Sequence, residues 1–250
     1  MSVLNRRRRL VAEYHREQEV KLELGEEGYT RLKALLMDES AKTPAKLVGV
    51  RFQCNRFYDQ GTLLWDRDTK LRLRREFFVP EEALSLVTFC APAYQTPSEL
   101  ILTAKCGRGQ QRAGVSDQDE HSYAFPEDER ERVWADMSET LAFEHVAQLG
   151  LPVEMHLFIE ELALACWGSF ENERYEFVAD ENLVCLDRTT FSNAMRDWEL
   201  EIETERPEEA LAEWTLFLTG HGIPWELQSH GKARRLRNAI GIAPAHSAGP

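Results

Sequence analysis

The stretch EQEVKLEL at residues 17–24 alternates charged residues with residues that are mostly apolar. The side chains of a β-strand alternate between two faces, so a strand here places Glu17, Glu19 and Lys21 on one face and apolar side chains on the other. One face then carries two carboxylates and an ammonium group side by side. A solvated surface strand can show the same pattern, so its meaning depends on the other strands of the chain.

Basic residues alternate in the same way in later segments. In the stretch LRLR at residues 71–74, Arg72 and Arg74 share one face of a predicted strand. Two neighbouring guanidinium groups repel each other unless an anion lies between them. Lys105 ends another predicted strand, and Arg174 begins a third. Arginine and lysine suit phosphate oxygens, so these segments indicate binding of a phosphate-containing anion.

A second acidic strand is predicted at residues 197–204, where Glu199, Glu201 and Glu203 share one face. Grouped carboxylates suit hard divalent cations such as Mg²⁺ or Mn²⁺. Glu203, at the end of the strand, is either a further ligand or a surface residue, and we favour the surface position. We expect Asp197, at the start of the strand, to lie on the surface as well.

Two architectures accommodate these charged faces. In the simpler one, each charged face is solvated on the outside of a sandwich or an open sheet. In the other, the strands close into a barrel whose charged faces line a cavity for a polyanion, while the apolar faces pack outward under helices. The recurrence of charged strands, together with three helices that have apolar stripes, favours the second. We therefore predict an α+β fold, a closed antiparallel eight-stranded β-barrel with helices packed outside.

The hydrophobic periodicity predicts a single domain. The predicted strands are 17–24, 47–58, 69–78, 99–105, 156–167, 173–179, 183–188 and 197–204. The predicted helices are 26–37, 126–149, 207–220 and the basic segment 232–237. Residues 107–131 lack an apolar period and are predicted to form a loop. We expect a basic N-terminal arm at residues 1–14, including Arg6 to Arg9, one domain at 15–240, and a disordered tail at 241–250.

The composition excludes several classes of protein. The chain has 250 residues, 43% of them hydrophobic, which is ample for a packed core. Its net charge of -13 argues against general nucleic-acid binding, which needs a basic footprint. It contains no run of 18 apolar residues and no apolar signal-peptide core, so we expect a cytoplasmic protein without a membrane partner. The five cysteines lack C-x-x-C spacing, which predicts reduced thiols.

Seven motifs, in order, resemble those of the CYTH superfamily, also called triphosphate tunnel metalloenzymes. They are Glu17-x-Glu19-x-Lys21, LRLRRE at 71–76, LTAK at 102–105, Arg174, Leu186-Asp187, WELEIE at 198–203 and GKARR at 231–235. This family includes inorganic triphosphatases, thiamine triphosphatases, class IV adenylyl cyclases and fungal RNA triphosphatases. The resemblance implies a tunnel-shaped barrel that binds a triphosphate together with Mg²⁺ or Mn²⁺.

The resemblance also implies roles for individual residues. The implied metal ligands are Glu17, Glu19, Asp187, Glu199 and Glu201. The implied phosphate contacts are Lys21, Arg72, Arg74, Lys105, Arg174 and Lys232. Of these residues, the implied catalytic ones are Lys21, Arg72, Arg74 and Glu201. A family arginine expected within 107–131 has no clear counterpart, and Arg108 and Arg112 are the candidates.

The implied function is metal-dependent hydrolysis of inorganic triphosphate or of a small organic triphosphate, such as thiamine triphosphate or a nucleotide. One alternative is a class IV-type adenylyl cyclase, although the sequence contains no recognisable adenine-binding motif. Another is a non-catalytic polyphosphate-binding module, against which the carboxylates argue, because a polyanion needs only the basic set. The expected partner is a small-molecule triphosphate, bound by a monomer or a homodimer.

Overall fold

The computed structural model describes residues 12–38, 40–41, 43, 45–84, 99–107 and 114–242. The predicted basic arm as far as Val11 and the predicted tail from Ala243 lie outside the described residues. Arg108 and Arg112 lie outside them as well.

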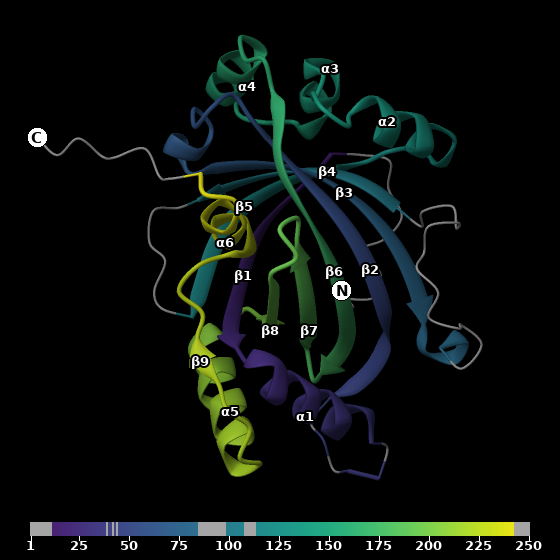
Figure 1. Cartoon of the computed structure of the whole chain (residues 1–250), viewed down its shortest axis with the longest axis vertical. Coiled ribbons are helices and arrows are strands. Elements are labelled where there is room, and N and C mark those ends of the chain that lie inside the picture. The colour runs from purple at the N-terminus through teal and green to yellow at the C-terminus, as the bar shows by residue number, and fades with distance from the viewer. Residues whose placement is uncertain are drawn as a thin grey trace, which may run out of the picture.

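Within the described residues, eight antiparallel strands close into a barrel (Figure 1). Their order around the barrel is β5-β4-β3-β2-β6-β7-β8-β1, and pairing of β5 with β1 closes the ring. A short ninth strand, β9, pairs with the end of β1. The strands are β1 (Glu13–Glu23), β2 (Lys46–Asp59), β3 (Thr69–Pro80), β4 (Glu99–Gly107), β5 (Val115–Ala124), β6 (Ala165–Ala179), β7 (Asn182–Phe191), β8 (Arg196–Glu203) and β9 (Glu226–Leu227). The predicted α+β barrel is confirmed.

Helices cover the outside of the barrel (Figure 1). They are α1 (Gly25–Met37), α2 (Arg130–Asp136), α3 (Phe143–Val146), α4 (Val153–Glu160), α5 (Pro207–Gly220) and α6 (Lys232–Ala239). In the part of the chain that the structure describes, none of these helices has the length and apolar character needed to cross a bilayer.

The outward faces of the strands form the hydrophobic core. Val20 and Leu22 of β1 pack in one cluster with Leu32 of α1 and Trp214 of α5. A second cluster joins β3 and β4 to α2, α3 and α4. The strand positions between these apolar residues point inward, as the alternation in residues 17–24 predicted. The barrel is therefore stabilised from outside, which leaves its interior free for polar side chains.

The predicted loop at 107–131 is wrong, because β5 lies within it. This strand has no apolar face. Gln118 and Glu120 line the interior of the barrel, while Asp117 and Asp119 form hydrogen bonds with polar side chains of β1. Hydrophobic periodicity cannot identify a strand whose two faces are both polar.

Two further elements differ from prediction. The predicted strand 156–167 is helix α4 followed by the start of β6, which continues through the predicted strand 173–179. Leu157 and Ile159 would share one face of a strand, but Leu157 is exposed and Ile159 is buried, because residues two apart lie on opposite sides of a helix. The predicted helix 126–149 is interrupted after α2. The chain there pairs with β6 instead, because the backbone carbonyl of Glu139 accepts a hydrogen bond from the backbone amide of Cys166 at the start of β6 (2.7 Å).

Candidate functional site

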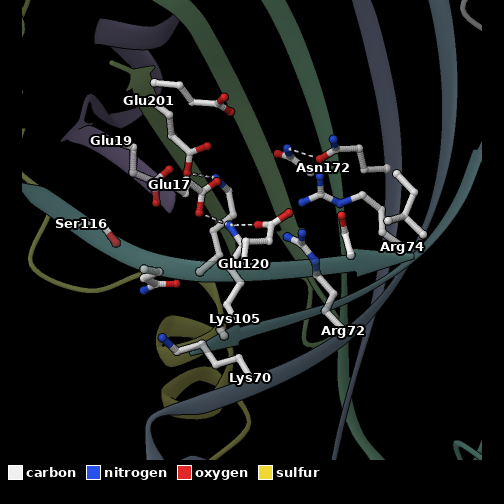
Figure 2. A pocket seen from close by; sticks show the side chains of 18 of the residues that line it. Glu17, Glu19, Lys70, Arg72, Arg74, Lys105, Ser116, Glu120, Asn172 and Glu201 are labelled. Atoms are coloured by element: carbon white, nitrogen blue, oxygen red, sulfur yellow. Dashed lines mark hydrogen bonds and ion pairs between the residues drawn. The ribbon is translucent and has the colours of Figure 1, made fainter. Parts of the chain in front are cut away.

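The barrel encloses a cavity of about 1330 Å³ lined by the inward faces of its strands. Because successive strand residues alternate in direction, charged residues two positions apart gather inside. Basic side chains gather on β3 and β4 and acidic side chains on β1 and β8 (Figure 2), while further charged residues of both signs line the rest of the cavity. The cavity therefore has a basic wall and an acidic wall.

The basic wall consists of Lys70, Arg72 and Arg74 on β3 and Lys105 on β4 (Figure 2). Lys70 is the cross-strand partner of Lys105. Burial and repulsion by Arg74 lower the pKa of Arg72 to about 10. Arg72 Nε is buried and has no hydrogen-bond partner among the described residues. A buried, unpaired donor beside like charges is the arrangement that an anion would stabilise.

The acidic wall consists of Glu17 and Glu19 on β1 and Glu201 and Glu203 on β8. Glu19 and Glu203 are cross-strand partners. Burial and the carboxylate of Glu17 raise the pKa of Glu203 to about 8, and burial also raises the pKa of Glu19. The surface position predicted for Glu203 is therefore wrong, because β8 continues along the cavity to its last residue.

Lys21 and Lys105 connect these charged groups. Lys21 Nζ lies 2.8 Å from Glu19 Oε1 and 3.0 Å from Glu201 Oε1, so it bridges the two acidic strands. Lys105 Nζ contacts Glu17 and lies 2.9 Å from Glu120 Oε2. Lys21 and Lys105 are thus already paired with carboxylates before any ligand is considered.

A buried carboxylate cluster lies next to the acidic wall. Carboxylate oxygens of Asp187, Glu199 and Glu201 lie within 4.8 Å of one another. Arg174 donates to both oxygens of Asp187 at 2.8 and 2.6 Å and also contacts Glu201. Lys232 Nζ lies 2.7 Å from Asp187 and 2.9 Å from Glu201, and it contacts Glu199. Arginine and lysine therefore offset the charge of this cluster.

The donor chemistry of both acidic groups fits a divalent cation. Carboxylate oxygens are the hard ligands that Mg²⁺ and Mn²⁺ prefer, and Glu201 belongs to both groups. Burial is the largest cause of the raised pKa values of Glu19 and Glu203, and the crowding of neighbouring carboxylates, among them Glu17, raises both further. A divalent cation held among Glu17, Glu19 and Glu201 would relieve this crowding.

The structure brings most of the predicted site residues together. All of them except Asp187 and Glu199 line the cavity. These two are buried in the adjacent cluster, and both contact Lys232, which lines the cavity. The structure thus places the residues, while their roles as metal ligands and phosphate contacts stay predictions.

Other residues of the site were missed or misplaced. Lys70 lines the cavity, and its position two residues before Arg72 on the same strand face was a usable signal. Glu120 had no such signal, because its strand was predicted to be a loop. Asp197 contacts Arg235 and is largely buried, so its predicted surface position is wrong. The inward positions of β5 include Ser116 and no arginine or lysine in the described part of that strand.

Comparison with known proteins agrees with this geometry. Residues 15–220 match the CYTH domain family. A solved structure from Hippeastrum, described as a proposed adenylyl cyclase with a dominant triphosphatase activity, is 22% identical with a TM-score of 0.65, covering 89% of this chain and 95% of that one. A proposed adenylate cyclase from Bacillus halodurans is 18% identical with a TM-score of 0.57, covering 89% of this chain and 97% of that one. No curated protein sequence matches the chain at a significant level. At these identities the two structures support the fold, and the match across residues 15–220 shows that the chain belongs to the CYTH domain family.

Proposed function

We propose that this protein is a divalent-metal-dependent triphosphatase that hydrolyses inorganic triphosphate or a small organic triphosphate inside the barrel. The observation that carries the proposal is a basic wall on β3 and β4 and an acidic wall on β1 and β8 in one cavity. A polyphosphate alone requires only the basic wall. The acidic wall provides sites for the metal that phosphoryl transfer uses to offset phosphate charge.

The residues of the basic wall would bind and orient the phosphate chain. Arg72 and Arg74 can each form two parallel hydrogen bonds with phosphate oxygens, and Lys105 supplies a compact positive charge. Charge spreads over the oxygens of the transferred phosphoryl group in the transition state, so fixed cations in a buried cavity stabilise it. This chemistry needs no serine, cysteine or histidine nucleophile.

The residues of the acidic wall would hold the metal. Bound Mg²⁺ or Mn²⁺ would offset phosphate charge and activate water for attack on phosphorus. Glu17, Glu19 and Glu201 are the proposed ligands at the cavity, with Asp187 and Glu199 in the adjacent cluster. Lys21 orients two of these carboxylates, because its Nζ lies between Glu19 and Glu201.

Adenylyl cyclase activity is the second candidate. The descriptions of the proteins from Hippeastrum and Bacillus halodurans both name a proposed adenylyl or adenylate cyclase, which supports testing ATP. The dominant triphosphatase activity described for the Hippeastrum protein supports placing hydrolysis first. Product analysis separates the two, because a cyclase releases cyclic AMP and pyrophosphate from ATP whereas the hydrolase releases ADP and phosphate.

The decisive experiment measures phosphate release from tripolyphosphate with Mg²⁺ or Mn²⁺. Arg72→Gln should lower kcat/KM by about 100-fold, the loss typical of removing one preorganised charge contact. Arg75→Gln is the matched control, because Arg75 lies on the same strand but points outward to Glu131, 3.1 Å away. If the protein hydrolyses none of the triphosphates tested, with either metal, the proposal is refuted. Tight binding of tripolyphosphate without metal and without turnover would instead support a binding module.

A further inference from the structure

A row of uncharged polar side chains crosses the interior of the barrel and ends on a carboxylate. Thr189 on β7, Asn172 on β6, Gln53 on β2 and Glu76 on β3 are cross-strand partners in succession, so they lie at one level of the barrel. Each of the four is at most 4% exposed. Buried polar groups of this kind must be satisfied by one another, and we call the row the polar relay.

The hydrogen bonds of the polar relay all point toward Glu76. The Thr189 hydroxyl donates to Asn172 Oδ1 at 3.0 Å, and Asn172 Nδ2 donates to Gln53 Oε1 at 3.1 Å. Gln53 Nε2 then donates to Glu76 Oε2 at 2.7 Å. An ionised carboxylate can only accept hydrogen bonds, so Glu76 fixes which way the amide of Gln53 faces, and Gln53 fixes the amide of Asn172. Bonds arranged head to tail in this way strengthen one another.

Glu76 connects the polar relay to the basic wall. Its Oε2 lies 3.5 Å from Arg74 Nη1, while its Oε1 lies 3.1 Å from Arg51 Nη1. Arg74 Nε donates to Asn55 Oδ1 at 3.0 Å, and Arg74 lines the cavity (Figure 2). The guanidinium of Arg74 is thus held at two of its nitrogens, by one carboxylate and one amide of the barrel.

Arg74 needs this support because it lies beside another arginine. Arg72 occupies the neighbouring inward position on β3, about 7 Å away along the strand. Burial and repulsion by Arg74 lower the pKa of Arg72. Without an anion, this repulsion favours side-chain conformations that separate the two guanidinium groups. A phosphate would then have to order Arg74 on binding, at a cost in conformational entropy that a fixed Arg74 avoids.

We propose that Gln53 and Asn172 are positioning residues of the phosphate site, which hold Glu76 and, through it, keep Arg74 in the orientation that binds phosphate. The inference rests on the proposed triphosphate site and adds residues to it that carry no charge. A merely structural role makes a different prediction, because it would give Gln53 the same effect on phosphate binding whether or not Arg74 is present.

Calorimetry with tripolyphosphate and no added divalent cation measures binding without turnover. Gln53→Met removes the donor to Glu76 at similar volume, and we expect the affinity to fall by at least about 10-fold, the loss typical when the partner that orients a binding residue is removed. In protein that already carries Arg74→Gln, Gln53→Met should change the affinity by less than about 2-fold, because the residue through which Gln53 acts is gone. Asn172→Leu should give a smaller loss that likewise disappears with Arg74→Gln.

Tyr58→Phe is the matched control for loss of a buried hydrogen bond. The hydroxyl of Tyr58 donates to the carbonyl of Met137, and Tyr58 does not line the cavity, so the affinity should stay within about 2-fold. If Gln53→Met does not fold, Gln53→Asn retains an amide that is one methylene too short to reach Glu76, and the same comparison applies.

Unchanged affinity in Gln53→Met would overturn the inference. Equal fold-losses with and without Arg74 would overturn it as well, since Gln53 would then act independently of Arg74. Absence of tripolyphosphate binding to the intact protein would remove the phosphate site and the inference together. If binding and its dependence on Arg74 are observed but no triphosphate is hydrolysed, only the proposed hydrolysis fails.

Discussion

Lys105 on β4 forms an ion pair with Glu17 on β1, although β5 lies between these two strands in the barrel (Figure 2). Burial raises the pKa of Glu17, but the charge and hydrogen bond of Lys105, together with the charge of Lys21, lower it overall. A predicted phosphate contact is thus neutralised by a predicted metal ligand. Joint binding of phosphate and metal would give each of them a new partner of opposite charge, which explains how both groups can be buried in one cavity.

Replacing Lys105 tests this pairing. We expect Lys105→Gln to lower kcat/KM for tripolyphosphate by about 100-fold, because one fixed cation of the basic wall is lost. The control is Lys46→Gln, at an exposed position at the start of β2, which should change the rate by less than about 2-fold. Phosphate-release kinetics measure both variants. A rate for Lys105→Gln equal to that of the control would remove Lys105 from the phosphate site.

Replacing Glu201 tests the metal site without relying on turnover. Glu201 lines the cavity and also belongs to the cluster with Asp187 and Glu199. We expect Glu201→Gln to weaken Mn²⁺ binding by at least about 10-fold, measured from the electron paramagnetic resonance signal of free Mn²⁺. Glu173→Gln is the control, because Glu173 pairs with Lys33 and Arg188 outside the cavity lining. Unchanged Mn²⁺ affinity in Glu201→Gln would contradict the proposed ligand set.

The ionisation of Glu120 predicts a dependence of stability on pH. Burial raises the pKa of Glu120, but Lys105 and Arg72 outweigh burial and lower it from 4.5 to about 2. Because the folded-state value lies below the unfolded-state value, the stabilisation is complete above about pH 4.5 and is lost as the pH falls toward 2. Urea denaturation should show Glu120→Gln less stable than the intact protein by on the order of 3 kcal/mol at pH 6 and by much less at pH 2.5.

The matched control for this measurement is Glu131→Gln. Glu131 is a largely exposed partner of Arg75 on the outside of the barrel, so its replacement should change stability little at either pH. A stability difference for Glu120→Gln that is the same at pH 6 and pH 2.5 would show that its ionisation is not linked to folding.

The barrel and several of the charged residues of the cavity were predictable because charged and apolar residues alternate along single strands. Glu17, Glu19 and Lys21 point inward for the same local reason that Val20 and Leu22 pack outward. Lys70 follows the same rule, because it lies two residues before Arg72 on the same face of β3.

Other features of the site arise from closure of the barrel and leave no local signal. β5 is polar on both faces, so its pairing with β1, and the position of Glu120 beside Lys105, become visible only in three dimensions. A cluster of aromatic side chains beside α6 likewise joins Trp65, which lies in a short turn, to Phe57 on β2 and Phe170 on β6. Contacts between residues so far apart in sequence depend on strand register rather than on periodicity.

Arg51 provides a test of how the interior of the barrel is stabilised. It is 2% exposed and contacts Glu176 and Glu76, the latter at 3.1 Å, and Glu76 also accepts a hydrogen bond from Gln53 at 2.7 Å. Burial raises the pKa of Glu76, but Arg51, together with Arg74 and the hydrogen bond from Gln53, lowers it overall. Arg51→Met would leave two carboxylates without this partner, so we expect the free energy of unfolding to fall by about 3–5 kcal/mol in urea denaturation.

The control for Arg51 is Arg188→Met. Arg188 pairs with Glu173, but its side chain is 45% exposed, so water replaces the lost partner and the expected change is at most about 1 kcal/mol. If the free energy of unfolding falls by a similar amount in both variants, water screens the interior ion pairs to the same extent as the surface pair. A much larger loss in Arg51→Met would show that the interior carboxylates depend on Arg51 even though Arg74 lies 3.5 Å from Glu76.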